Sequence, residues 1–273
     1  MVKREDEICT RSGGTRPRKK YRLLELIRWE LETTYRIPLF ELVLGLTVLL
    51  VMTSPPLYTR GVSVESATAA VALFATTLDS WLFLYFVAYS VPLAISLGGI
   101  FETGEVRILL SYPFRRFELV GTKVAANLLV LSGTAIAPVV LRVALEFSPV
   151  ALAYPQVLLA LALLLLALGL RVFLIVAVTA FFAVLSRNSK IAIFAAFGLL
   201  FVMMIVTSLL PRPFSFFVSI GQAGLVLLSF NNWLWGETLP NPFEFPGPLL
   251  FLAVTSVALL LAATLLFQSR DVT

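Results

Sequence analysis

The chain has 273 residues, of which 59% are hydrophobic and only 14% are charged. Soluble domains are about half apolar and about a quarter charged, so this composition excludes an ordinary soluble protein. The sequence has no histidine and a single cysteine, Cys9, which removes the commonest general base and excludes a disulfide within the chain. Several uncharged runs approach the ~20 residues that a helix needs to cross a ~30 Å hydrocarbon core. We therefore expect an all-α, polytopic membrane protein.

The N-terminal region is strongly basic, because residues 1–36 hold ten of the 21 Lys and Arg residues. Residues 1–21 are predicted to be a disordered cytoplasmic tail near anionic lipid rather than a nucleic-acid-binding arm. They are charged, so we expect no cleavable signal peptide, and the first span should act as its own signal. Residues 22–36 are predicted to form an amphipathic helix that lies on the cytoplasmic membrane face. Its apolar face would consist of Leu24, Ile27, Leu31 and Tyr35, and its charged face of Glu25, Arg28, Glu32 and Arg36.

Residues 22–273 are predicted to form a single transmembrane domain with six spans. Their approximate limits are 39–54, 80–100, 117–145, 155–185, 191–210 and 248–267. The residues between the first two spans, 55–79, are expected to form an outer loop. Span 4 is long for one crossing at 1.5 Å per residue but short for two, and we interpret it as one tilted helix.

Residues 214–236 are also uncharged, which leaves two alternatives. They form either a further span or a helical or re-entrant segment on the outer face. Glycines and the pair Asn231-Asn232 interrupt the run, and a proline-rich stretch follows, so we favour the outer-face segment. A further span here, or a division of span 4 into two, would place the C-terminus outside.

The basic residues predict the orientation of the six spans. With the N-terminus inside, seventeen of the 21 Lys and Arg residues lie on the inner side, Arg60 and Arg212 lie outside, and Arg142 and Arg171 lie within spans. Inner loops of membrane proteins carry an excess of basic residues. Both termini are therefore predicted to be cytoplasmic, in a multi-pass protein of the plasma membrane.

The loop between spans 2 and 3 is short and carries many charges. It belongs to the stretch FETGEVRILLSYPFRRFELVGTKVAA, residues 101–126. Thr103 to Ser111 is predicted to form a short amphipathic helix on the cytoplasmic side. Tyr112-Pro113 should end it, because a residue that precedes proline is disfavoured in the helical region.

This loop resembles the signature of the permease subunits of ABC-2-type transporters. The family pattern is approximately E-x-G-T-x-x-x-L-L-x-x-P-x-x-R, with G-K near the start of the next helix. The matching residues here are Glu102-x-Gly104, Leu109-Leu110-Ser111-Tyr112-Pro113-x-x-Arg116 and Glu118-Leu119-x-Gly121-x-Lys123. The match covers about 22 positions, and the six-span layout with an outer helical hairpin before span 6 is also similar. Two positions depart from the pattern, since Glu105 replaces the threonine and Thr122 separates the Gly-Lys pair.

The resemblance implies that the short helix is a coupling helix, which docks into a groove on a separate ATPase subunit. Apolar side chains would fill that groove, and charged ones would fix the register. It also implies a second permease chain, either identical or related. The docking residues would be Glu102, Gly104, Glu105, Val106, Arg107, Leu109, Leu110, Pro113 and Arg116.

ATP chemistry is expected outside this chain, because the sequence has no G-x-x-x-x-G-K-[ST] phosphate loop. The partner ATPase would bind ATP and Mg²⁺, and we expect no enzyme activity, metal or cofactor in this chain itself.

Charged residues within the predicted spans need partners. Arg142 and Glu146 are one helical turn apart and should form a local ion pair. Arg171 lies near the middle of span 4, where an arginine costs at least ~2.5 kcal/mol, so it should face the bundle interior. Asp79, Glu146 or backbone carbonyls are candidate partners. Arg171 would then serve either as a contact for an anionic substrate or as half of a structural pair.

Three other functions are alternatives to an ATP-driven exporter. A membrane enzyme needs clustered carboxylates, histidines or a nucleophile at membrane depth, which the sequence does not offer. A secondary transporter favours intramembrane carboxylates and repeated halves. A membrane scaffold without an ATPase partner is opposed only by the family signature. The sparse charge suits an amphipathic or lipidic cargo, but the residues do not identify the substrate.

Overall fold

The computed structural model describes residues 25, 27–32, 38–54, 63–111, 116–147, 154–209, 223–236 and 246–269, and every element among them is helical. Five helical stretches there are long and apolar enough to cross a membrane. The all-α, multi-pass membrane character predicted from the composition is therefore confirmed for this part of the chain. The predicted tail, residues 1–21, and the ends of the predicted amphipathic helix lie outside the described residues. The five stretches are Phe83–Glu102, Phe117–Glu146, Pro155–Ser186, Ser189–Val206 and Gly247–Ser269.

The last four predicted spans agree closely with helices of the structure. They correspond to α7 (Arg116–Glu146), α9 (Pro155–Ser186), α10 (Ser189–Leu209) and α13 (Gly247–Ser269). The uninterrupted α9 confirms the interpretation of span 4 as one helix. It begins with a proline, whose missing N–H has no partner to lose at that position.

The first predicted span is α2, Pro38–Thr53, an apolar helix of 16 residues. This length falls short of the ~20 residues of a full crossing, so α2 is not among the five helices long enough to span. A count of six spans therefore belongs to the proposals below rather than to the described fold.

The prediction that residues 55–79 form a loop is wrong from Val64 onwards. Val64–Ser80 forms a 17-residue helix, α3, and the Ser63 hydroxyl accepts a hydrogen bond from the N–H of Ser66 at its start. Alanine, the best helix former, supplies five of its residues, which explains the helix despite its modest apolar content. A bend at Trp81 joins α3 to α4, Leu82–Leu93.

The helix that contains the second predicted span is irregular. After α4, the chain makes a π-helical turn, Ala94–Gly98, and then a last helical turn, α5, Gly99–Glu102. Proline lies inside α4 at Pro92, where it cannot donate a backbone hydrogen bond. The irregular stretch therefore comes at the end of this span, just before the charged loop.

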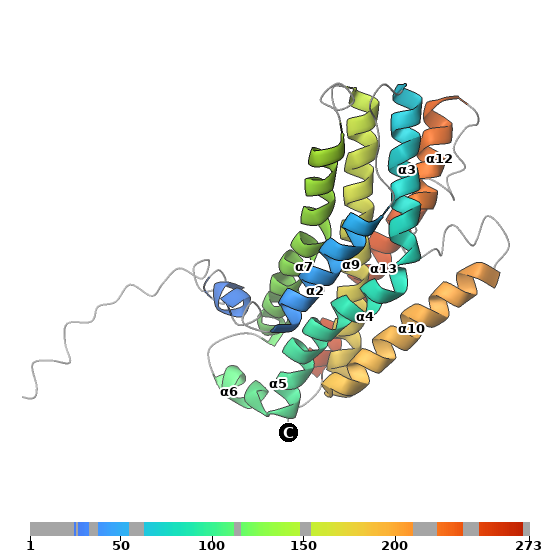
Figure 1. Ribbon diagram of the computed structural model, residues 1–273. Coiled ribbons are helices and arrows are strands. Elements are labelled where there is room, and N and C mark those ends of the chain that lie inside the picture. Colours follow the sequence, from blue (N-terminus) through green and yellow to red (C-terminus); the bar gives the residue numbers. More distant parts are fainter. Residues whose placement is uncertain are drawn as a thin grey trace, which may run out of the picture.

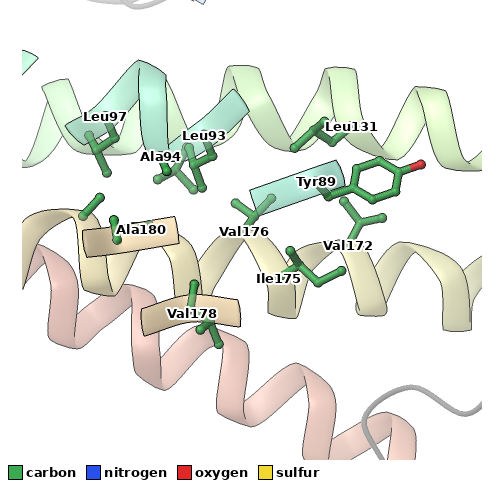
Figure 2. Packing of buried hydrophobic residues seen from close by; sticks show 14 of the residues in the cluster. Tyr89, Leu93, Ala94, Leu97, Leu131, Val172, Ile175, Val176, Val178 and Ala180 are labelled. Carbon is green, nitrogen blue, oxygen red and sulfur yellow. The ribbon is translucent and has the colours of Figure 1, made fainter. Parts of the chain in front are cut away.

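Helix α9 runs through the centre of the bundle, with the other long helices around it (Figure 1). Residues 174–180 are all buried, so α9 packs against neighbours on every side in this region. The main hydrophobic core of the protein surrounds this part of α9. Figure 2 shows Leu93, Ala94 and Leu97 packing toward α9 in this core, with Leu131 of α7 nearby. The irregular turn is thus held against the part of α9 that is buried on every side.

A second hydrophobic core lies at the other end of the bundle, between α3, α12 (Ala223–Leu234) and the neighbouring halves of α7 and α9. Helices α3 and α12 are antiparallel, because Thr68 near the start of α3 donates to Asn231 near the end of α12. Their backbones approach closely at Gly224, where an added Cβ would lie 2.7 Å from Thr76 Cα. The described part of the predicted outer segment is therefore helical, and α12 is too short to cross a bilayer.

Candidate functional site

The segment that carries the charged signature lies at one end of the bundle, together with the start of α10 and the N-terminal helix, of which residues 27–32 are described (Figure 1). Helix α6, Glu105–Ser111, confirms a short helix at this position. Gly104 separates it from α5 and has φ of +74°, a left-handed conformation that other residues adopt only with strain. This turn gives a physical reason for glycine in the signature.

Helix α6 divides its side chains between the protein core and the surface. Val106 is only 2% exposed and belongs to the main core, and Leu109 packs partly buried against that core. This chain therefore encloses Val106, and its role in filling a groove on a partner stays a prediction. Glu105 and Arg107 are exposed, and Ile108 is 63% exposed, so among the described side chains of α6 Ile108 is an apolar one that points outward.

Three of the predicted docking positions cannot be placed in this way. The side chains of Leu110 and Arg116, and the whole of Pro113, lie outside the described part of the chain. Their predicted role stays a prediction.

Glu102 contacts the start of another helix. Its carboxylate accepts hydrogen bonds from the backbone N–H of Ser189 at 2.8 Å and from the Ser189 hydroxyl at 3.0 and 3.1 Å. Ser189 is the first residue of α10, and a carboxylate at a helix N-terminus is favourable for the unpaired N–H groups and the helix dipole. Glu102 thus fastens α5 to α10 across 87 positions of sequence, a contact that no local pattern predicts.

A buried ion pair lies beside the same segment. Lys123 Nζ of α7 is 2.8 Å from both carboxylate oxygens of Glu30, and the two side chains are only 8% and 4% exposed. Ser96 of the π-helical turn donates a hydrogen bond of 2.7 Å to the same carboxylate. Asn127 lies beside Ser96 and donates to the backbone oxygen of Lys123. Four polar side chains from three elements therefore meet in an otherwise apolar region.

Sequence reasoning missed this cluster. Lys123 was noted only as part of the family signature, and Glu30 was not singled out at all. The signal that could have indicated it is a lysine eight residues into a span, at a position that must be buried and therefore needs a negative partner. The identity of that partner depends on the fold, since Glu30 is 93 positions away.

Arg171 pairs with Asp79, the first of the predicted candidates. The Asp79 carboxylate also accepts hydrogen bonds from the backbone N–H groups of Ala223 and Gly224, at 3.2 and 2.8 Å. Burial raises the pKa of the Asp79 carboxyl, while the Arg171 guanidinium and these two N–H groups act in the opposite direction. The pair joins α3, α9 and the start of α12, an arrangement that favours a structural role.

Arg142 forms the predicted ion pair with Glu146, at 2.9 Å. It also donates to the backbone carbonyls of Val51 and Ser54, the latter at 2.6 Å. These carbonyls belong to the end of α2, where a helix has no internal donors for its last oxygens. Arg142 therefore caps α2 from α7, which the sequence did not predict.

Metal chemistry finds no support in the described ranges, which contain no group of three or more His, Cys, Asp or Glu side chains arranged to hold a metal ion. The polar contacts described above connect helices, and the exposed face of α6 is the part of the signature that points away from the bundle.

No model of a known protein family matches the chain. A comparison with curated proteins gives no significant match either. The family resemblance therefore rests on the signature residues and the helical layout alone.

Proposed function

We propose that the chain is the membrane-spanning permease subunit of an ATP-driven transporter of the ABC-2 type, most simply an exporter. A separate ATPase subunit would dock on α6 and bind ATP and Mg²⁺. The complex would contain two permease chains, identical or related, in the plasma membrane. The cargo that best fits the sparse charge is amphipathic or lipidic.

The observation that carries this proposal is the construction of the α5–α6 segment. Glu105, Arg107 and Ile108 project from the end of the bundle, while Val106 on the opposite side of the same helix is buried in the core. Among its described side chains, a helix held in this way offers a partner one apolar and two charged groups, and it cannot move without displacing the helices behind it. That combination suits a device that receives force from a soluble subunit.

The proposed orientation places α6 and both termini in the cytoplasm. Its support is the distribution of Lys and Arg residues, which favours the inner side seventeen to two in a six-span arrangement. In this arrangement α2 counts as the first span, although it is short, and α3 and α12 belong to the outer side.

The test is copurification from native membranes with a subunit that carries an ATP-binding phosphate loop, identified by mass spectrometry. The test variant is Glu105→Lys with Ile108→Asp, which alters only exposed side chains of α6. The matched control is Glu65→Lys, an exposed charge reversal in the first turn of α3 at the opposite end of the bundle. We expect the native chain and the control to retain the ATPase subunit, and the α6 variant to lose at least about 90% of it, a loss of roughly 1.4 kcal/mol or more in binding.

Two results would contradict the proposal. If the native chain never copurifies with an ATPase subunit, a secondary transporter or a membrane scaffold becomes the better explanation. If the ATPase subunit is retained equally by all three chains, it binds elsewhere and α6 is not the docking helix.

A further inference from the structure

The π-helical turn Ala94–Gly98 contacts parts of the chain that are far apart in sequence. Turns of this type are rare, and they occur frequently at functional sites. From this turn, the Ser96 hydroxyl reaches Glu30 of the N-terminal helix, whose described part is residues 27–32. The backbone of Gly98 lies against α10, because a Cβ at Gly98 would be only 2.7 Å from Ser189 Cα.

The contact with the N-terminal helix fixes one relative position of the two elements, because it depends on a buried ion pair and a hydrogen bond. Glu30 and Lys123 are almost completely buried, and removing two charges from water is favourable only if the pair is well aligned and further hydrogen bonds are made. Here the Glu30 carboxylate accepts hydrogen bonds from both Lys123 and Ser96. Apolar side chains could also hold the helix against α7, but they would allow it to slide or rotate. The charged cluster fixes one position relative to the turn.

The contact with α10 is equally constrained. Gly98 leaves no room between the turn and Ser189, and Glu102, one helical turn later, binds the N–H and the hydroxyl of the same serine. The start of α10 is therefore attached at two successive points of one segment. Helix α6 follows immediately after that segment, and Val106 anchors it in the same core.

We propose that the π-helical turn is a mechanical joint, locked by Glu30, Lys123 and Ser96, through which a displacement of α6 reaches both the N-terminal helix and α10. The three residues are positioning residues. The source of the displacement, an ATPase subunit, rests on the function proposed above, but the joint is a property of this chain alone.

The first test needs only the full-length chain in lipid nanodiscs and measures backbone amide hydrogen exchange. Lys123→Met keeps the length of the side chain but leaves the Glu30 carboxylate without its cation. We expect exchange to accelerate by about tenfold or more, together, in residues 27–32, in the π-helical turn and in the first turn of α10. Helices α3 and α12 at the other end of the bundle should keep their native rates.

Two further variants make this result specific. Arg142→Met removes another buried cation from the same helix, α7, and should accelerate exchange at the end of α2 but not in residues 27–32. The charge exchange Glu30→Lys with Lys123→Glu should restore slow exchange at least in part. Faster exchange confined to α7 in Lys123→Met, or an effect of Arg142→Met on the N-terminal helix, would overturn the joint. If Lys123→Met unfolds globally, Ser96→Ala replaces it, with the same expected segments and a smaller acceleration.

The second test uses the complex with its ATPase subunit and measures a spin-label distance between Arg28→Cys and Ile191→Cys, both exposed positions, in a Cys9→Ser background. We expect ATP with Mg²⁺ to change this distance in the native cluster and to change it at most half as much when Lys123→Met is added. An equal change in both would refute transmission through the joint while the proposed function stands. If hydrogen exchange responds as expected but the native chain never copurifies with an ATPase subunit from native membranes, the proposed function is refuted and the joint stands.

Discussion

Gly98 and Gly99 are neighbours that differ sharply in their tolerance of a side chain. A Cβ at Gly98 would lie 2.7 Å from Cα and 2.9 Å from N of Ser189, whereas a Cβ at Gly99 would meet nothing within 4 Å. The obstacle at Gly98 is backbone, so it cannot rotate away. We expect Gly98→Ala to lower the free energy of unfolding by about 1–3 kcal/mol.

The matched control is Gly99→Ala, which should be neutral or stabilising by up to about 1 kcal/mol, because alanine is the better helix former. Thermal unfolding in detergent checks both variants. Equal midpoints for Gly98→Ala and the native chain would show that α10 does not pack against the π-helical turn as described.

Individual contacts were predictable from the sequence only where the partners are close in the chain. Arg142 and Glu146 are four residues apart on one helix, so their pairing follows from helix geometry. Arg171 required a partner because of its burial, and Asp79 was one of three candidates. The pairs Glu30–Lys123 and Glu102–Ser189 each join residues about ninety positions apart. Nothing in the local sequence specifies such partners before the helices are packed.

At the scale of the helix, hydropathy predicted the long apolar elements well and the less apolar ones poorly. Limits for α7, α9, α10 and α13 agree to within two residues, because charges or prolines punctuate these runs. Helix α3 was missed, since a mixture of alanine, threonine and two acids looks like a loop on hydropathy alone. For α6, the periodicity indicated two faces but did not tell whether this chain or a partner covers the apolar one.

The attachment of α3 to α9 and α12 depends on the pair Arg171–Asp79. Arg171→Met should lower the free energy of unfolding by about 3–5 kcal/mol, because it leaves a buried carboxylate without its cation. Adding Asp79→Asn should recover part of this loss, since the neutral amide oxygen can still accept from one of the two N–H groups that Ala223 and Gly224 donate.

Chemical denaturation of the single and double variants in detergent measures the difference. A double variant that is less stable than Arg171→Met alone would show that the two residues act independently, which the geometry does not allow.

At the scale of the whole molecule, the bundle is longer than a bilayer is thick. Helix α9 has 32 residues, so it measures about 48 Å against a hydrocarbon core of ~30 Å. In the proposed orientation, the part of α9 that exceeds the hydrocarbon core lies on the outer side, with α3 and α12 beside it. The second hydrophobic core would then stabilise a short helical extension beyond the membrane.

Cysteine labelling in whole cells tests this arrangement, in a Cys9→Ser background. A membrane-impermeant maleimide should label Glu65→Cys, at the start of α3, in intact cells. It should label Ile108→Cys, on α6, only after the membrane is permeabilised, with at least about a tenfold difference. The opposite pattern would invert the orientation, and labelling of both in intact cells would place the two ends on one side.

The cap that Arg142 provides at the end of α2 has a consequence for the surrounding lipid. A helix of 16 residues is about 24 Å long, several ångströms less than the hydrocarbon core. Its last carbonyls would ordinarily have to reach water, but the guanidinium of Arg142 satisfies those of Val51 and Ser54 from within the protein. In the proposed six-span arrangement, α2 would therefore end below the headgroups, and the adjacent leaflet would thin or its acyl chains would tilt to match it. The protein should accordingly enrich shorter-chain phospholipids around α2, and it should favour thin membranes over thick, sterol-rich ones.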